Sequence, residues 1–247
     1  MNIAFYSGVS GLVAYQQDMD TIAHNMANVN TVGYKPLRTE FSDLLYTRMA
    51  INNEEEKLVG HGVRASKVEL LYGQGNLQST EYPLDFALVG EGFFAVDRGR
   101  GTLEYTRNGA FDLSVEGKKT YLVTADGGYV LDGKGKPIEV KRATDGTYDY
   151  GDVQDRLGVY RFDNPYGLEV TTGSSFRETD VSGRAEAVQV GRGEESPYRI
   201  VSGAVESSGV NLGQQMVDVI MTQKAYQFNA KIVQTADELE EIVNNLR

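Results

Sequence analysis

The 247-residue chain contains no cysteine, and this absence removes several kinds of chemistry at once. Without a thiol the chain can form no disulfide, no thiolate metal site and no cysteine nucleophile. The absence says little about compartment by itself, although an exported assembly has reason to avoid stray thiols that cross-link its subunits. The expected location therefore shifts slightly toward the outside of the cell.

Basic residues are outnumbered, with 24 Lys and Arg against 35 Asp and Glu, for a net charge of −11. Such a chain is repelled by phosphate backbones and anionic lipids, and no basic cluster interleaved with aromatic residues offsets the repulsion. No apolar run approaches the roughly 20 residues of a membrane span. The first residues lack the basic start and continuous apolar core of a Sec signal peptide. We expect neither nucleic-acid binding nor direct membrane insertion.

Candidate catalytic and metal-binding residues are few. Neither of the two histidines, His24 and His61, stands in a metal or triad pattern. Residues 128–134 fit the start of a phosphate loop, but Gly135 occupies the Ser/Thr position that binds Mg²⁺, and the local pattern is a β-turn. Four aspartates could in principle surround Ca²⁺, but their spacing matches no EF-hand and suits a solvated turn: Asp145, Asp149, Asp152 and Asp155. The sequence predicts no catalytic residue, metal or cofactor.

Residues 211–247 carry the pattern of a long amphipathic helix. Asn211 is a suitable N-cap, and the run is about 50 Å long if it is helical throughout. Steps of four and three, typical of a coiled-coil seam, connect Leu212, Met216, Val219, Gln223, Tyr226, Ala230 and Val233. A second stripe drifts around the axis and indicates more than one partner: Ile232, Ala236, Leu239, Val243 and Leu246.

A second amphipathic helix is predicted near the N-terminus, over residues 2–28. Its apolar stripe also steps by three and four: Leu12, Tyr15, Met19, Ile22, Met26 and Val29. The helix should end before Gly33, which tolerates positive φ, and Pro36, which cannot continue a helix. Two helices at opposite ends of a chain can pair only if the residues between them return to their starting point. The middle of the chain is therefore predicted to be an inserted domain.

The middle of the chain divides into a connector and a β domain. Residues 34–75 are rich in acidic and amide side chains and are predicted to be an extended connector, with turns at Gly60 and Gly62. Short apolar runs punctuated by turns follow, and Asn108 with Gly109 is the strongest hairpin signal. We expect an α+β fold. An all-β domain of short antiparallel strands spans 76–205, inserted between a coiled-coil pair formed by residues 1–33 and 206–247.

Asparagine and glutamine residues beside the helical stripes can fix the register of packed helices, which suits packing among many copies of the chain. With the apolar stripes they define the expected assembly interface. Its residues are Leu12, Met19, Ile22, Asn25, Met26, Asn28, Leu212, Met216, Val219, Gln223, Tyr226, Asn229 and Val233.

Several segments carry a family likeness. Residues 23–35, AHNMANVNTVGYK, resemble the A-N-N-L-A-N-x-N-T-x-G-[FY]-K signature of bacterial flagellar rod and hook proteins. Residues 221–231, MTQKAYQFNAK, resemble the C-terminal helix motif of that family. Residues 92–94, 105–111 and 122–127 are similar to its β-domain motifs. The matches lie at both ends and in the middle, in the order of the family.

The resemblance implies a structural subunit without enzymatic activity. Such a subunit is exported by the flagellar type III apparatus and assembles helically, with itself and with other rod and hook proteins, into a rigid axial rod for motility. The resemblance places the subunit in the flagellar basal body, outside the cytoplasmic membrane, in the periplasm or cell-wall zone. Length and the long connector most resemble the distal rod proteins, with the proximal rod proteins second and the hook protein less similar.

Two other classes of protein share part of the pattern. A secreted coiled-coil adhesin would have similar helices and a β domain, but would more naturally carry a Sec signal. An enzyme with a β-sheet cleft would need several convergent titratable residues. Electron microscopy of concentrated protein separates the readings, since rods or protofilaments support a polymer subunit and discrete trimers or monomers support the others.

Overall fold

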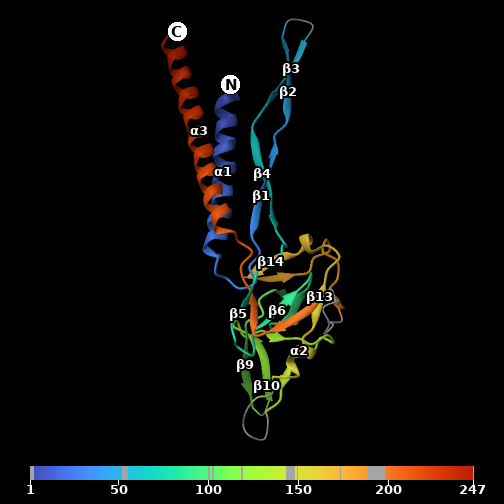
Figure 1. The fold of residues 1–247 in the computed structure, drawn as a ribbon. Helices are drawn as coiled ribbons and strands as arrows, with labels where there is room; N and C mark the ends of the chain where they lie inside the picture. The colour runs from blue at the N-terminus through green and yellow to red at the C-terminus, as the bar shows by residue number, and fades with distance from the viewer. Residues whose placement is uncertain are drawn as a thin grey trace. The chain divides into compact units, whose positions relative to one another are not determined.

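The computed structural model of the chain describes residues 3–51, 55–99, 101, 103–117, 119–142, 148, 150–172, 174–188 and 198–246. Its fold is α+β: a long helix lies near each end of the chain, and in the sequence a large β-rich region separates the two helices (Figure 1). The residues form two compact units. The helical unit comprises Met1–Ala27, Leu37–Leu71 and Asn211–Arg247, and the β unit comprises Asn28–Pro36 and Tyr72–Val210.

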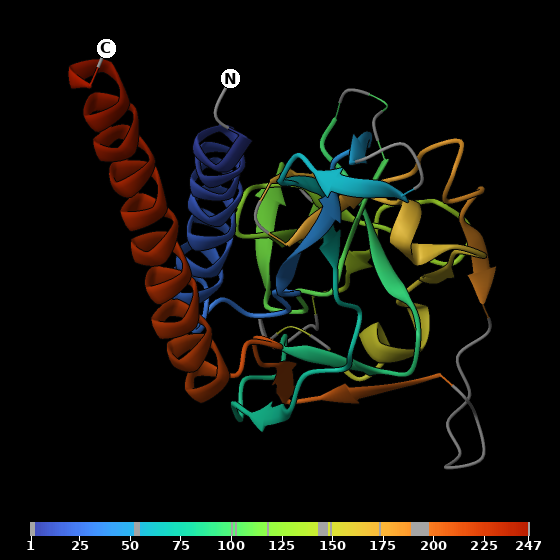
Figure 2. The same ribbon diagram turned by 90° about the horizontal axis from the view of Figure 1, so that it is seen from above.

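The helical unit contains α1 (Ile3–Ala27) and α3 (Leu212–Asn245). The helices run antiparallel, because Gly8 near the start of α1 faces Val233 and Asn25 near its end bonds Gln215. Figures 1 and 2 show them side by side, with both chain ends at the same end of the pair. The predicted N-cap is confirmed, since the Asn211 side chain accepts a hydrogen bond from the Gln214 backbone nitrogen at 3.2 Å.

The segment predicted to be an extended connector, residues 34–75, forms four strands that pair two by two in the helical unit. Strand β1 (Leu37–Asp43) pairs antiparallel with β4 (Val63–Leu70), and β2 (Tyr46–Ile51) pairs with β3 (Glu55–Gly60). Both β1 and β4 pack against α1. The chain approaches α1 closely at Gly62, whose φ is +107° and where a Cβ atom would lie 2.0 Å from the Ser10 hydroxyl oxygen.

The β unit is built from short strands, and every pairing described in it is antiparallel. Its main sheet runs in the order β12-β10-β11-β7-β8-β15-β14, with β9 added to β10 and with β13 pairing both β7 and β16. Two further pairs join β17 to β6 and β18 to β5. The strands are β5 (Leu77–Ser79), β6 (Phe86–Val89), β7 (Phe93–Asp97), β8 (Leu103–Thr106), β9 (Phe111–Glu116), β10 (Lys119–Thr124), β11 (Tyr129–Val130), β12 (Glu139–Val140), β13 (Val159–Arg161), β14 (Glu169–Thr172), β15 (Ser175–Arg177), β16 (Glu186–Val188), β17 (Arg199–Ser202) and β18 (Ala204–Glu206).

The core of the β unit is aliphatic and aromatic. Phe94 contacts Phe111 edge to face, with ring centroids 5.4 Å apart, and Leu122, Val130 and Ile138 are fully buried around them. A short helix, α2 (Val153–Arg156), places Val153 in the same core, and a 3₁₀ turn, η1 (Pro165–Gly167), lies farther along the chain. Asp145 and Asp149 of the acidic loop lie outside the described residues.

The hairpin predicted at Asn108 and Gly109 is wrong. Asn108 and Gly109 connect β8 to β9, but β8 pairs with β7 and β15, whereas β9 pairs with β10. Gly109 instead lies against β6, where a Cβ atom would be 1.6 Å from the Phe86 carbonyl oxygen. Asp126 and Gly127 join two paired strands, because Val123 of β10 lies opposite Tyr129 of β11.

Buried tyrosines should make the β unit sensitive to alkali. Burial raises the pKa of Tyr34 and of Tyr105 from 10.0 to about 12. The folded state therefore keeps protons that the unfolded state loses. This part of the stability is fully present below pH 10 and is lost as the pH rises toward 12. We expect the free energy of unfolding in urea to fall by about 1–2 kcal/mol per buried tyrosine between pH 9 and 11.5.

The matched variant is Tyr105→Phe, which should lose less stability over the same pH interval because one titrating hydroxyl is gone. Lys35 has the opposite effect on stability. Burial lowers its pKa from 10.5, so below that pH the folded chain binds fewer protons at Lys35 than the unfolded chain does, and stability rises with pH. An equal loss in the variant and the unchanged chain would show that Tyr105 does not carry the effect.

Candidate assembly site

The face of α3 that meets α1 is polar or small at its centre. Positions seven residues apart, Gln215, Thr222, Asn229 and Ala236, form this inner seam, and only Thr222 and Ala236 are buried among the described side chains of α3. Thr222 donates to the Asp18 carboxylate at 2.8 Å, and a Cβ atom on Gly11 would lie 2.7 Å from the Asn229 side-chain oxygen. The absence of a side chain at Gly11 lets the two helices approach closely.

Asn25 ties three elements of the helical unit together. Its side-chain nitrogen donates to the Leu37 carbonyl at 2.7 Å and to the Gln215 side-chain oxygen at 3.0 Å. Its side-chain oxygen accepts from the Leu37 backbone nitrogen at 2.8 Å. The asparagine therefore fixes the start of β1 and the register of α3 against α1, and it is 1% exposed.

Large apolar side chains of α3 are exposed in this chain. Beginning at Met221, eight positions follow one another in alternating steps of four and three: Met221, Ala225, Phe228, Ile232, Thr235, Leu239, Ile242 and Leu246. All but Ala225 are exposed, and Met221 and Phe228 are both 65% exposed. We call these eight residues the outer seam. A sustained step of four and three on an exposed face is the spacing by which one helix packs along another.

The predicted interface residues fall into three groups. Ile22 and Asn25 are buried inside the chain, so they support the helical unit. The half-buried residues are Leu12, Met19, Met26, Asn28, Val219, Tyr226, Asn229 and Val233. The exposed ones are Leu212, Met216 and Gln223. Four large members of the outer seam are not among the predicted interface residues, although Leu239 belongs to the second predicted stripe: Met221, Phe228, Leu239 and Ile242.

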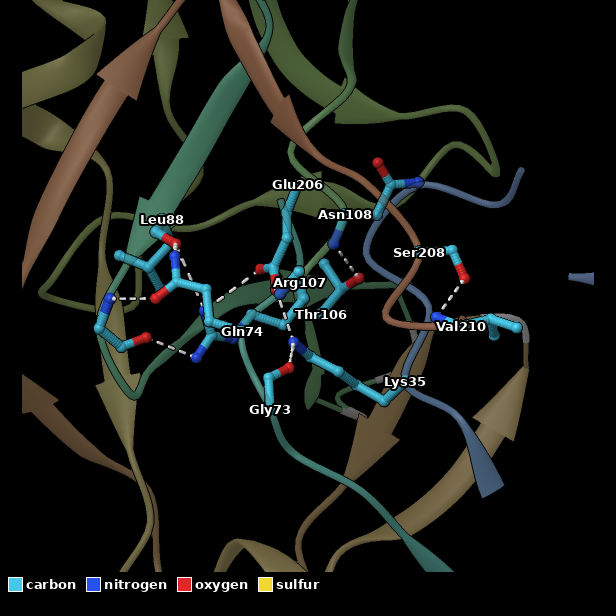
Figure 3. Close-up of polar contacts among 12 residues, drawn as sticks. Lys35, Gly73, Gln74, Leu88, Thr106, Arg107, Asn108, Glu206, Ser208 and Val210 are labelled. Carbon is cyan, nitrogen blue, oxygen red and sulfur yellow. Dashed lines mark hydrogen bonds and ion pairs between the residues drawn. The ribbon is translucent and has the colours of Figure 1, made fainter. Parts of the chain in front are cut away.

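A buried ion cluster lies in the β unit, and Figure 3 shows its polar contacts. The Lys35 Nζ donates to Glu206 Oε1 at 2.6 Å and to the Gly73 carbonyl at 2.8 Å. The same carboxylate oxygen accepts from the Gly75 backbone nitrogen at 2.7 Å, and Oε2 lies 3.3 Å from Arg107 Nη1. We call Lys35, Arg107 and Glu206 the clamp.

All three clamp side chains are removed from water, with exposures of 3% for Lys35, 4% for Arg107 and 0% for Glu206. Burial lowers the pKa of both Lys35 and Arg107, and the Glu206 carboxylate acts against this shift. Arg107 also donates to the Gly90 carbonyl at 2.6 Å and stands over the Phe93 ring, 5.4 Å from its centroid. The clamp joins segments that are distant in the sequence.

Gly33 brings the N-terminal segment to the clamp. Its φ is +67°, and a Cβ atom would lie 2.6 Å from both the Arg107 carbonyl carbon and the Asn108 nitrogen. Its own nitrogen donates to the Glu206 carbonyl oxygen at 2.8 Å. The end of the sequence signature, Gly33-Tyr34-Lys35, is therefore packed into the β unit, with Tyr34 buried.

Groups of metal ligands and membrane-spanning helices are both absent from the described part of the chain. Within it, no group of three or more histidine or acidic side chains could hold a metal ion. None of its helices is long and apolar enough to cross a membrane.

Comparison with known proteins yields matches along most of the chain. Three family models match: "Flagella basal body rod protein" over residues 5–35, "Flagellar hook protein FlgE/F/G D1 domain" over 87–154, and "Flagellar basal body rod FlgEFG protein C-terminal" over 201–246. The clamp residues Lys35 and Glu206 fall in the first and last of these matches, and Arg107 falls in the middle one.

Similar proteins cover nearly the whole chain. A flagellar basal-body rod protein FlgG of Borreliella burgdorferi is 33% identical, covering 99% of this chain and 98% of its own length. Proteins of the same name from Bacillus subtilis and Agrobacterium fabrum are each 34% identical, covering 98% and 95% of both chains respectively. The chain therefore belongs to the flagellar basal-body rod protein family, as a structural subunit of the rod.

Proposed function

We propose that the chain polymerises helically through its terminal helices, and that a second copy covers the outer seam of α3. The observation that carries this proposal is the inverted distribution of side chains on α3. Thr222 and Ala236 are the buried side chains of the described part of α3, whereas Phe228, Leu239 and Ile242 are exposed. A helix whose large apolar side chains are exposed over several turns marks a protein–protein contact.

Covering the outer seam with a second copy of the chain is energetically more favourable than leaving it exposed to water. Complete burial of one large apolar side chain stabilises by about 1.5–3 kcal/mol, so several seam residues can offset the entropy lost on association. We propose that α1 and α3 form a coiled coil and that its inner hydrogen bonds, such as Asn25 to Gln215, set the register. A contact between two different faces produces an open helical polymer when the rotation from copy to copy does not close a ring.

We propose that the polymer forms a rigid axial shaft outside the cytoplasmic membrane, with other rod and hook proteins as its neighbours. Membership of the rod family supports these partners, and the identity to FlgG proteins supports the distal part of the rod. The same family membership supports passage through the flagellar type III export apparatus. The role is structural and includes no catalysed reaction.

Phe228→Asp should abolish polymerisation while the β unit stays folded. A carboxylate in a buried helix seam lacks a partner and costs several kcal/mol, enough to shift the association equilibrium by about a hundredfold or more. Analytical ultracentrifugation measures the polymer, and near-ultraviolet circular dichroism measures the packing of the β unit. The control is Gln227→Glu, which adds the same charge to the adjacent exposed position outside the seam.

The control variant should polymerise like the unchanged chain. If both variants polymerise normally, α3 is not an interface. If the unchanged chain forms discrete trimers rather than rods in electron micrographs, helical polymerisation through the terminal helices is contradicted.

A further inference from the structure

Glu206 holds together three parts of the chain that are far apart in the sequence. It lies 171 residues after Lys35, its partner in the segment that follows α1, and 99 residues after Arg107, which follows β8. Its third partner is the Gly75 nitrogen, just before β5. Strand β18, which carries Glu206, itself pairs with β5. These contacts form only when the last strand of the β unit is in place.

Without the Glu206 carboxylate, the clamp would contain two positive charges and no negative one. Two cations, Lys35 and Arg107, meet a single carboxylate, and all three groups are buried. Before Glu206 is placed, closing the β unit would bury two positive charges whose described hydrogen-bond partners are carbonyl oxygens, with the Phe93 ring and the charge of Glu91 acting on Arg107 alone. Burying charges without a counter-charge is far more costly than burying a pair, so the open state is favoured until the carboxylate arrives.

We propose that the clamp is a folding latch, through which the β unit closes only after Glu206 has joined Lys35 and Arg107. Because Glu206 is the last of the three in chain order, a chain that emerges N-terminus first cannot close its β unit early. The connection to export rests on the proposed function, whereas the latch itself is a property of the monomer. The latch would keep a partly translocated chain open and let it fold once residue 206 has passed.

The test measures refolding of full-length chains from urea by tyrosine fluorescence, at a dilution where no polymer forms. Glu206→Gln keeps the shape but removes the counter-charge, and we expect refolding at least about tenfold slower. Adding Lys35→Met removes the surplus cation, so the double variant Lys35→Met/Glu206→Gln should refold faster than Glu206→Gln alone. A recovery on removing a second buried residue is the signature of charge, because lost packing would slow refolding further.

Glu206→Asp keeps the charge and provides a variant that folds if Glu206→Gln does not. It should refold within a few fold of the unchanged chain. The proposal is overturned if Glu206→Gln changes only the unfolding rate, since the clamp then forms after the unit has closed. It is also overturned if the double variant refolds more slowly than Glu206→Gln. A third contradicting result is that Glu206→Asp refolds as slowly as Glu206→Gln. Because every readout comes from the monomer, failure of the latch leaves the polymer proposal untouched.

Discussion

Gly33→Ala should unfold the β unit or bring it close to unfolding, with a loss of about 3 kcal/mol or more in the free energy of unfolding. Two costs combine at this position. A side chain at a φ of +67° costs about 1 kcal/mol. The added Cβ would also meet the backbone at Arg107 and Asn108, which cannot rotate away as a flexible side chain could. Urea unfolding followed by near-ultraviolet circular dichroism measures the loss.

Gly127→Ala separates the two costs. Gly127 has a φ of +80° in the turn between β10 and β11, but an added Cβ would meet nothing within 4 Å. The variant should therefore lose only about 1 kcal/mol, the cost of the backbone conformation. Similar losses for the two variants would mean that the N-terminal segment is not packed against Arg107 as described.

A fragment of residues 76–205 should not fold, although these are the bounds that the sequence pattern suggests for the β domain. The β unit also includes Asn28–Pro36 and continues to Val210. The fragment lacks Lys35 and Glu206, leaves Arg107 without its carboxylate, and omits the last residue of β18. Since domains are stable by only about 5–15 kcal/mol, losing a buried ion cluster and a packed segment should leave less than roughly a tenth of the molecules folded.

A fragment of residues 28–210 is the matched comparison, because it retains every segment of the β unit. It should show cooperative thermal unfolding by circular dichroism, whereas the shorter fragment should give no transition. A cooperative transition in both fragments, at similar temperatures, would contradict a role for the two flanking segments in the β unit.

The helices could be predicted from the sequence because their period is local. Steps of three and four residues and the cap at Asn211 identify both elements without any knowledge of tertiary structure. The orientation of α3 could not be predicted in the same way. Apolar residues usually face the interior of a chain, but the inner seam of α3 contains Gln215, Thr222 and Asn229, and the large apolar residues of the outer seam are exposed. Positions in both seams repeat every seven residues, so the period of the sequence alone does not show which seam faces α1.

The clamp and the wrong hairpin depend on contacts that no local pattern contains. Lys35 and Arg107 stood in the motifs that resembled the family, yet nothing near either residue in the sequence points to Glu206. Asn108 and Gly109 formed a strong turn signal, but the neighbours of β8 and β9 were decided by other strands. The four strands of the predicted connector were missed because most of their described side chains are exposed, which removes the alternation of polar and apolar residues.

The absence of cysteine makes one measurement especially direct. Leu239→Cys places a single thiol in the outer seam, at an exposed position of the isolated chain. A second copy covering the seam should protect that thiol in assembled rods, so maleimide labelling should be at least about tenfold slower there than in the dilute monomer. Val181→Cys, on an exposed residue of the β unit, reports reagent access in the same rods. Equal labelling rates of Leu239→Cys in monomer and rod would contradict assembly through the outer seam of α3.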